Sequence, residues 1–291
     1  MTLLAYQVFK TVVEQGSFNK AADLLNLTPS AISHGINAME KELGFPLFVR
    51  NKKGISLTSY GENLLPFING VLNSEESLQQ AIAQVNGLQQ GTVKLGCFSS
   101  VCTAWIPKLV ASFKKDYPNI TIQIFQGTYA DVAAWIKNGV VDLGFLSDSS
   151  ANGLELTSLY SDPLLCITPK HYIKGNHPDY IEPEELAEFD FVSQRESTDA
   201  DVQIYLQKNK VNIKSSCHVV DDISQIAMVS SGMGVCLMPE LVMRDMPYDV
   251  DTYKLKPAED RVIGICVLNE QLMPPAAKML HRHIVKMFKK K

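Results

Sequence analysis

The chain has 291 residues, of which 46% are hydrophobic and 20% are charged, a composition typical of a globular protein with about two domains. No apolar run reaches the roughly 18 residues of a membrane span, and the first residues lack a signal-peptide pattern, so we expect a cytoplasmic protein that does not insert into a membrane. The net charge of −4 is unevenly spread: residues 1–60 carry six Lys or Arg and four acidic residues, which allows a nucleic-acid-binding head on an acidic body.

Local signals predict three helices before residue 45. The first spans about residues 3–15 and stops at Gly16, and the second begins after Ser17, a good N-terminal cap. The third begins after Thr28, with Pro29 in its first turn, and ends at Gly44. The apolar residues of this third helix recur at helical spacing and form one stripe: Ile32, Ile36, Met39 and Leu43.

The second and third helices, joined by a tight turn, predict a helix-turn-helix. We expect Ser33, His34 and Asn37, on the polar face of the third helix, to approach base edges or phosphates in a major groove. Residues 47–57 predict a hairpin with a basic turn, a wing placed to touch phosphates. The alternatives are a helix with a merely solvated face and a basic turn that serves solubility.

Four ordered motifs in this region resemble those of LysR-type transcriptional regulators. Residues 16–22 are similar to the family's SFxxAA signature, 28–34 to its recognition-helix start, 43–50 to its LGxxLFxR stretch and 57–61 to its LTxxG. Thr28-Pro29-Ser30 stands where many members have Ser-Gln-Pro. The candidate DNA-binding residues are Ser17, Thr28, Pro29, Ser30, Ser33, His34, Asn37, Arg50, Lys52 and Lys53.

Residues 58 to about 86 predict one long helix, which Pro66 should bend near its start. Its apolar residues follow a 3.5-residue repeat that Glu75 interrupts, which is typical of a coiled-coil seam. The alternative is a helix packed on its own domain. The family resemblance implies an antiparallel dimer of linker helices, and the candidate seam residues are Leu64, Ile68, Val71, Leu78, Ile82 and Val85.

From residue 92 onwards, predicted strands alternate with helices, which indicates a mostly parallel α/β sheet. We expect strands over 93–98, 120–125, 141–146, 164–168, 191–192, 218–220, 235–238 and 262–268, and helices over 101–115, 131–138, 204–208, 224–231 and 276–288. This part resembles the family's effector-binding domain, a two-lobed fold like that of a periplasmic binding protein. The resemblance implies a first lobe of about 92–161 and 266–291 and a second of about 162–265.

Ligands of open α/β sheets sit beyond the carboxyl ends of the strands. The turn after the first strand offers hydroxyls and N–H groups that suit an anion such as a carboxylate, although its serines could simply cap a helix. In the family, hydroxyls after the first and second strands often hold the effector, and Ser99, Ser100 and Thr128 match those positions. The candidate effector-binding residues are Cys97, Ser99, Ser100, Val101, Thr128, Ser193, Gln194, Ile223 and Ser224.

Other chemistry is weakly indicated. Cys97 and Cys102 bracket the same turn and could form a thiol sensor, although buried and inert cysteines are commoner. The six cysteines form no CxxC pair, and the histidines show no metal-ligand spacing, so we expect neither a metal nor another cofactor. We find no catalytic motif, so we expect no enzyme; an α/β enzyme with a regulatory head and a transport module remain the rivals.

The sequence thus predicts an α/β protein with an N-terminal winged helix-turn-helix, a long linker helix and a two-lobed periplasmic-binding-protein-like effector domain. Residues 1–57 would bind double-stranded promoter DNA, 58–88 would dimerise, and 92–291 would bind a small-molecule effector. As a LysR-type regulator the chain would act as a dimer or tetramer and could contact RNA polymerase.

Overall fold

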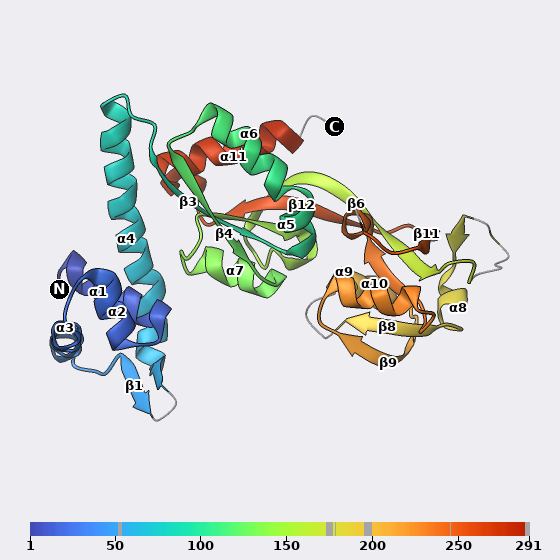
Figure 1. Ribbon diagram of the computed structural model, residues 1–291, viewed down its shortest axis with the longest axis horizontal. Helices are drawn as coiled ribbons and strands as arrows, with labels where there is room; N and C mark the ends of the chain where they lie inside the picture. The colour runs from blue at the N-terminus through green and yellow to red at the C-terminus, as the bar shows by residue number, and fades with distance from the viewer. Residues whose placement is uncertain (52–53, 173–176, 178, 195–199, 245, 289–291) are drawn as a thin grey trace.

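The computed structural model has a small N-terminal domain and one long helix at one end, and a two-lobed body that extends to the other end (Figure 1). It describes residues 1–51, 54–172, 177, 179–194, 200–244 and 246–288. No helix within these ranges is both long enough and apolar enough to cross a membrane.

The N-terminal domain is a winged helix-turn-helix, as predicted. Its helices are α1 (Leu3–Gln15), α2 (Phe18–Leu25) and α3 (Pro29–Leu43), and its antiparallel hairpin is β1 (Phe48–Asn51) and β2 (Gly54–Leu57). The hydroxyls of Ser17 and Thr28 accept backbone N–H groups in the first turns of α2 and α3, and Gly44 ends α3 in the left-handed conformation. Fully buried Phe9, Ile32 and Ile36 fill the core.

Helix α4 (Ser59–Val85) runs through Pro66 without interruption. At its start Ile68 is buried in the core of the N-terminal domain, and half-buried Leu64 packs against that core. Further along, the Nδ2 atoms of Asn69 and Asn73 donate to the carbonyls of Asn138 and Gly139, each at 2.8 Å. Helix α4 is therefore docked on the body by its own side-chain amides.

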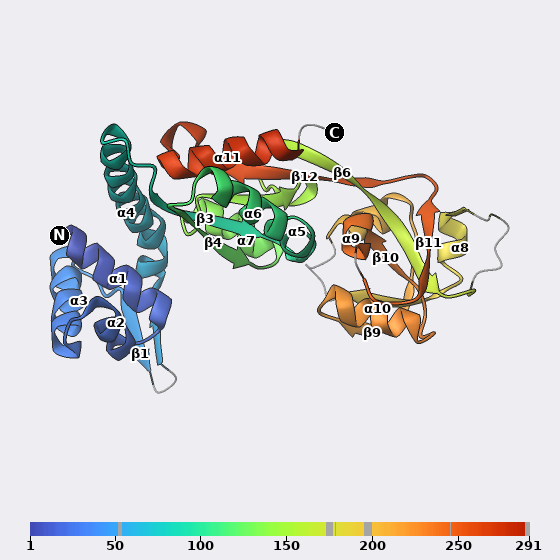
Figure 2. The same ribbon diagram turned by 45° about the horizontal axis from the view of Figure 1, so that its top comes forward.

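Lobe 1 is built on one twisted sheet. Its strands are, in spatial order, β4 (Ile120–Gln126), β3 (Gly91–Cys97), β5 (Leu143–Ser147), β12 (Asp260–Val267) and β6 (Glu155–Pro169). Helices α6 (Ile106–Asp116) and α11 (Pro275–Phe288) lie over one face of the sheet and α7 (Tyr129–Lys137) lies over the other (Figures 1 and 2). The short helix α5 (Ser99–Ala104) follows β3 directly.

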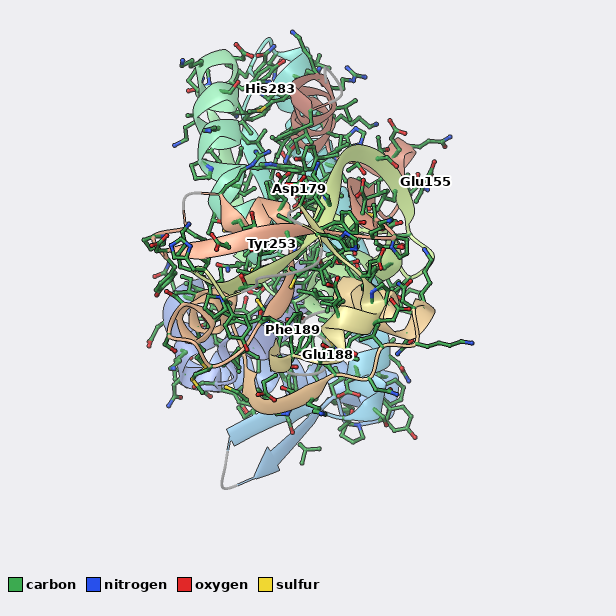
Figure 3. The ribbon with its side chains drawn as sticks, turned by 90° about the vertical axis from the view of Figure 1, so that its right-hand side faces the viewer. Glu155, Asp179, Glu188, Phe189, Tyr253 and His283 are labelled. Atoms are coloured by element: carbon green, nitrogen blue, oxygen red, sulfur yellow. The ribbon has the colours of Figure 1, made fainter. Side chains whose placement is uncertain are left out.

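Lobe 2 begins where the 15-residue strand β6 leaves lobe 1. There β6 pairs with β10 (Cys236–Pro239) and β11 (Val250–Leu255), and β11 pairs with β7 (Tyr180–Ile181). Strand β8 (Asp190–Gln194) is parallel to β9 (Lys214–Val219), and α8 (Pro183–Leu186), α9 (Ala200–Lys208) and α10 (Asp222–Ser230) complete the lobe. Seen from this end, Phe189 and Tyr253 lie in lobe 2 and His283 lies far above them on α11 (Figure 3).

Strands β7 and β11 and helix α8 were not predicted, and β6 is longer than the strand expected over 164–168. Three further differences affect the arrangement of the lobes. The helix expected over 101–115 is broken at Trp105 into α5 and α6, because Pro107 lacks the N–H that a continuous helix would use and therefore starts a new helix. The large sheet is parallel only at its two ends, in β4–β3–β5 and in β11–β7. Between them, β12 pairs antiparallel with β5 and β6, and β6 pairs antiparallel with β10 and β11. The boundary expected at residue 265 falls inside β12, which pairs along its length with the lobe 1 half of β6.

A glycine in α4 fixes how this helix meets the wing. A Cβ at Gly61 would lie 2.5 Å from the Leu47 carbonyl oxygen and 2.7 Å from Leu57 Cδ2, whereas a Cβ at exposed Gly70 would meet nothing within 4 Å. We predict that Gly61→Ala lowers the free energy of unfolding by about 1–3 kcal/mol through overpacking. Gly70→Ala, the matched control in the same helix, should raise it by about 0.5–1 kcal/mol. Thermal unfolding followed by circular dichroism measures both, and shifts of the same sign would contradict this packing.

Candidate functional site

The polar face of α3 is open to solvent beside the hairpin. Pro29, Ser30, His34 and Asn37 are exposed and Ser33 is half-buried, while Ile32, Ile36 and Met39 on the opposite face are buried. This division follows from the helical spacing of the apolar residues. Helix α3 therefore packs its apolar side in the core and exposes its polar side to solvent.

Some of the other candidate DNA-binding residues already have a role in the local fold. Ser17 and Thr28 cap helices, so their hydroxyl oxygens accept the N–H groups of Lys20 and Ala31. Arg50 lies in β1, opposite Ile55. Lys52 and Lys53 lie outside the described residues.

Helix α4 carries an apolar stripe on its outward face. Val71, Leu78, Ile82 and Val85 of the expected seam are between 43% and 87% exposed, so the chain itself does not cover them. Phe67, which the sequence analysis missed, is 73% exposed and lies four residues before Val71, on the same face. Two of the expected seam residues differ: Leu64 and Ile68 pack in the N-terminal domain, because α4 completes that core before it leaves the domain. We call Phe67, Val71, Leu78, Ile82 and Val85 the α4 stripe.

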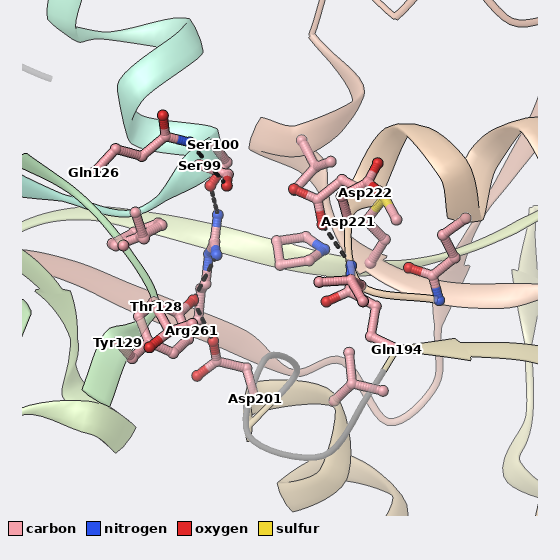
Figure 4. Close-up of a pocket in the computed structure, with 18 of the residues that line it drawn as sticks. Ser99, Ser100, Gln126, Thr128, Tyr129, Gln194, Asp201, Asp221, Asp222 and Arg261 are labelled. Atoms are coloured by element: carbon pink, nitrogen blue, oxygen red, sulfur yellow. Dashed lines mark hydrogen bonds between the residues drawn. The ribbon is translucent and has the colours of Figure 1, made fainter. Parts of the chain in front are cut away.

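A cavity of about 350 Å³ lies between the two lobes (Figure 4). From lobe 1 it is lined by the turns after β3 and β4, and from lobe 2 by the end of β8 and the starts of α9 and α10. Four predicted residues line it: Ser99, Ser100, Thr128 and Gln194. The position beyond the strand ends is the one that the α/β topology predicts.

Among the described residues, five predicted ones do not line this cavity. Cys97 and Val101 are fully buried in the lobe 1 core. Ser193 precedes Gln194 on a strand, where successive side chains point to opposite faces. Ile223 is exposed, and Ser224 bonds back to Asp221, the N-terminal cap of α10.

Arg261, whose guanidinium binds three side chains at the cavity, was not predicted. Its Nε and Nη2 lie 2.8 and 2.7 Å from Asp162 Oδ2, its Nη1 donates to the Tyr129 hydroxyl at 2.7 Å, and Nη2 donates to Ser100 Oγ at 2.8 Å. Asp162 is fully buried and also accepts the Leu241 N–H at 2.8 Å. Burial raises the pKa of Asp162, and the guanidinium opposes that shift by favouring the carboxylate.

A second set of hydrogen bonds joins the two lobes across the cavity. The Tyr129 hydroxyl donates to Asp201 Oδ2 at 2.8 Å, and Ser149 Oγ donates to Asp201 Oδ1 at 2.5 Å. Tyr129 and Ser149 belong to lobe 1, and Asp201 belongs to α9 of lobe 2. Burial, reinforced by Asp201, raises the pKa of Tyr129, so that its hydroxyl stays a donor.

The structure does not support the thiol-sensor alternative. Cys97 is fully buried, and burial together with neighbouring Cys102 raises the pKa of its thiol. A sensing cysteine needs exposure and a lowered pKa. Within the described residues no cluster of His, Cys, Asp or Glu could hold a metal ion.

The Arg261–Asp162 pair gives a stability prediction. Arg261→Met should lower the free energy of unfolding by about 3–5 kcal/mol, because it leaves the buried Asp162 charge without its partner. Adding Asp162→Asn should recover part of the loss, since the amide carries no charge. Arg244→Met, a matched change at an exposed position, should have a free energy of unfolding within about 0.5 kcal/mol of the wild type. Urea unfolding of the full chain provides the measurement, and a single variant as stable as the control would contradict the role of the pair.

Comparisons with known proteins agree with this architecture. In structure, the chain is similar to a full-length variant of OxyR from Pseudomonas aeruginosa, with a TM-score of 0.77 and 20% identity over 98% of this chain and 94% of that one. It is also similar to full-length CbnR in complex with its target DNA, with a TM-score of 0.66 and 18% identity over 98% of this chain and 99% of that one. At these identities the likeness shows the fold.

Sequence comparisons show the family. The chain is 28% identical over 282 residues to the uncharacterized HTH-type transcriptional regulator YvbU of Bacillus subtilis, covering 96% of each protein. The family model of the bacterial regulatory helix-turn-helix protein, lysR family, matches residues 3–62, and that of the LysR substrate binding domain matches residues 86–289. The protein therefore belongs to the LysR family of DNA-binding transcriptional regulators, as its sequence motifs predicted.

Proposed function

We propose that this regulator binds promoter DNA as a dimer and that a small molecule in the interlobe cavity alters the placement of its two DNA-binding domains. The observation that carries the proposal is the exposed polar face of α3 beside the wing, on the same chain as a cavity between two lobes. In this arrangement Ser33, His34 and Asn37 approach the bases, while Arg50, Lys52 and Lys53 supply electrostatic affinity.

Dimerisation is assigned to the α4 stripe. An exposed apolar row on a long helix is stabilised when a second copy covers it, and an antiparallel pair buries the whole row. The stripe lies on the side of α4 opposite Asn69, Asn73 and Gln80, which dock α4 on lobe 1, since a helix turns about 100° per residue. Docking on its own body therefore leaves the dimer face of α4 free.

Helix α7 supplies a physical connection between the cavity and α4. At its N-terminal end Thr128 and Tyr129 line the cavity, and just beyond its C-terminal end the carbonyls of Asn138 and Gly139 accept the hydrogen bonds from α4. A helix moves as a rigid unit, so a shift of Tyr129 on effector binding would tilt α4 and alter the spacing of the DNA-binding domains. Such a ligand acts through its different affinities for the two arrangements.

The same function places the protein in the cytoplasm with its DNA, as a dimer that can pair into a tetramer and contact RNA polymerase. The comparisons favour this function over the enzyme and transport alternatives, because the matching family models and the Bacillus subtilis relative are those of transcriptional regulators.

The dimer proposal is tested by placing charges on the stripe. Leu78→Asp combined with Ile82→Asp should convert the dimer into a monomer, because two carboxylates would be buried at the seam without partners. Sedimentation velocity measures the change, and DNase protection should shrink from a two-fold symmetric region to one half-site or vanish.

Leu268→Asp is the matched control, since Leu268 is 62% exposed but lies outside α4. It should leave both the dimer and the protection intact. A double variant that remains dimeric would refute the assignment of the stripe.

A further inference from the structure

We propose that the effector presents a positively charged nitrogen group, an ammonium or a guanidinium, to Asp222 at the lobe 2 wall of the cavity. The inference rests on the proposed function, because it takes the interlobe cavity as the effector site. It differs from the expectation of a carboxylate ligand, which was based on the turn after β3 alone.

The charge of the described lining residues opposes an anion. Four carboxylates line the cavity, those of Asp131, Asp201, Asp221 and Asp222, against one cation, Arg261. That cation is already ion-paired with Asp162 and also donates to Tyr129 and Ser100. An entering carboxylate would meet like charges with little compensation, whereas a cation would meet complementary ones.

Three of the four carboxylates already accept hydrogen bonds that stabilise helix starts or join the lobes. Asp131 Oδ2 accepts the N–H and the hydroxyl of Thr128 in a capping box at the start of α7. Both oxygens of Asp201 are used by Tyr129 and Ser149. Both oxygens of Asp221 are used by Ser224 at the start of α10.

Asp222 combines an open oxygen with partial burial. Asp131 also has an oxygen, Oδ1, that accepts nothing from the described residues, but Asp131 is exposed to water. Asp222 Oδ1 accepts one hydrogen bond, from Gln194 Nε2 at 2.5 Å, and its Oδ2 accepts none from the described residues. The side chain is half-buried, and burial raises the pKa of Asp222 against the effects of Gln194 and Arg261. A carboxylate that is partly removed from water and has an open oxygen is stabilised by a cationic donor more strongly than by a neutral one.

The rest of the cavity sets the size and shape of the ligand. A volume of about 350 Å³ accommodates a metabolite-sized molecule. The Phe98 ring, Val242 and Met238 offer apolar contact, and Ser99 and Gln126 offer polar groups on the lobe 1 wall, across from Asp221 and Asp222 (Figure 4). A molecule with a cationic end and a short carbon chain would contact both lobes at once and favour the arrangement in which the lobes face each other across it.

The test uses three probes that share one tetramethylene chain: putrescine with two ammonium ends, δ-aminovalerate with one ammonium and one carboxylate, and adipate with two carboxylates. Each is titrated into the full-length protein by calorimetry, with the thermal unfolding midpoint as a second readout. At least one of the two amines should bind, and adipate should bind more weakly than that amine.

Asp222→Asn keeps the shape of the side chain and removes its charge, so it should weaken amine binding about tenfold to a hundredfold. Asp249→Asn, a matched change at a highly exposed carboxylate of lobe 2, should leave binding unchanged. The proposal is overturned if neither amine binds up to millimolar concentration, if adipate binds best, or if Asp222→Asn binds the amines as tightly as the wild type.

DNase protection in the presence and absence of the bound amine separates this inference from the proposed function. Amine binding that depends on Asp222 but leaves the protected region unchanged would support the ligand class and refute the role of the cavity in regulation. Altered protection together with loss of amine binding in Asp222→Asn would support both.

Discussion

The buried ion pair between Arg261 and Asp162 is the interaction on which the effector domain depends. The two residues belong to β12 and β6, which pair where the chain crosses between the lobes, so the pair lies at the junction of both lobes. Removing two charges from water is costly, and the pair is retained because hydrogen bonds from Arg261 and Leu241 satisfy the carboxylate while the guanidinium also binds Ser100 and Tyr129. The pair therefore contributes to the geometry of the site, because it fixes the lobe 1 wall of the cavity relative to strands β6 and β12.

From this pair a continuous chain of contacts leads to the DNA-binding domain. Arg261 holds Tyr129, Tyr129 reaches across the cavity to Asp201, and Tyr129 also begins α7. The far end of α7 receives the amides of Asn69 and Asn73, and α4 in turn completes the core of the winged domain through Ile68. Each step is either a side-chain contact or a single helix, so a change in the angle between the lobes can be transmitted to the reading helix α3.

Sequence reasoning succeeded where the signal is local. Ser17, Thr28 and Gly44 determine helix ends within one turn of themselves, and the family motifs lie in the same short region, so the winged domain could be predicted closely. Arg261 could not be found in this way, because its partners lie 99 residues away at Asp162, 132 at Tyr129 and 161 at Ser100. The sequence also could not show that the start of α4 packs in the N-terminal domain while the rest of its apolar row is exposed. Ile68 and Val71 fit the same repeat, but Ile68 is buried in that domain and Val71 is exposed. The break at Trp105, by contrast, could have been predicted from Pro107.

DNase footprinting of wild type and Tyr129→Phe on the DNA flanking the protein's own gene tests the central claim most directly, because this variant removes the hydroxyl between Arg261 and Asp201 and leaves the ring in place. The account predicts that both proteins protect a two-fold symmetric region of several helical turns and that the variant changes its extent or its internal cleavage pattern. Identical protection by the two proteins would contradict the coupling of the cavity to the DNA-binding domains, and failure of the wild type to retain any DNA at low salt would contradict the account as a whole.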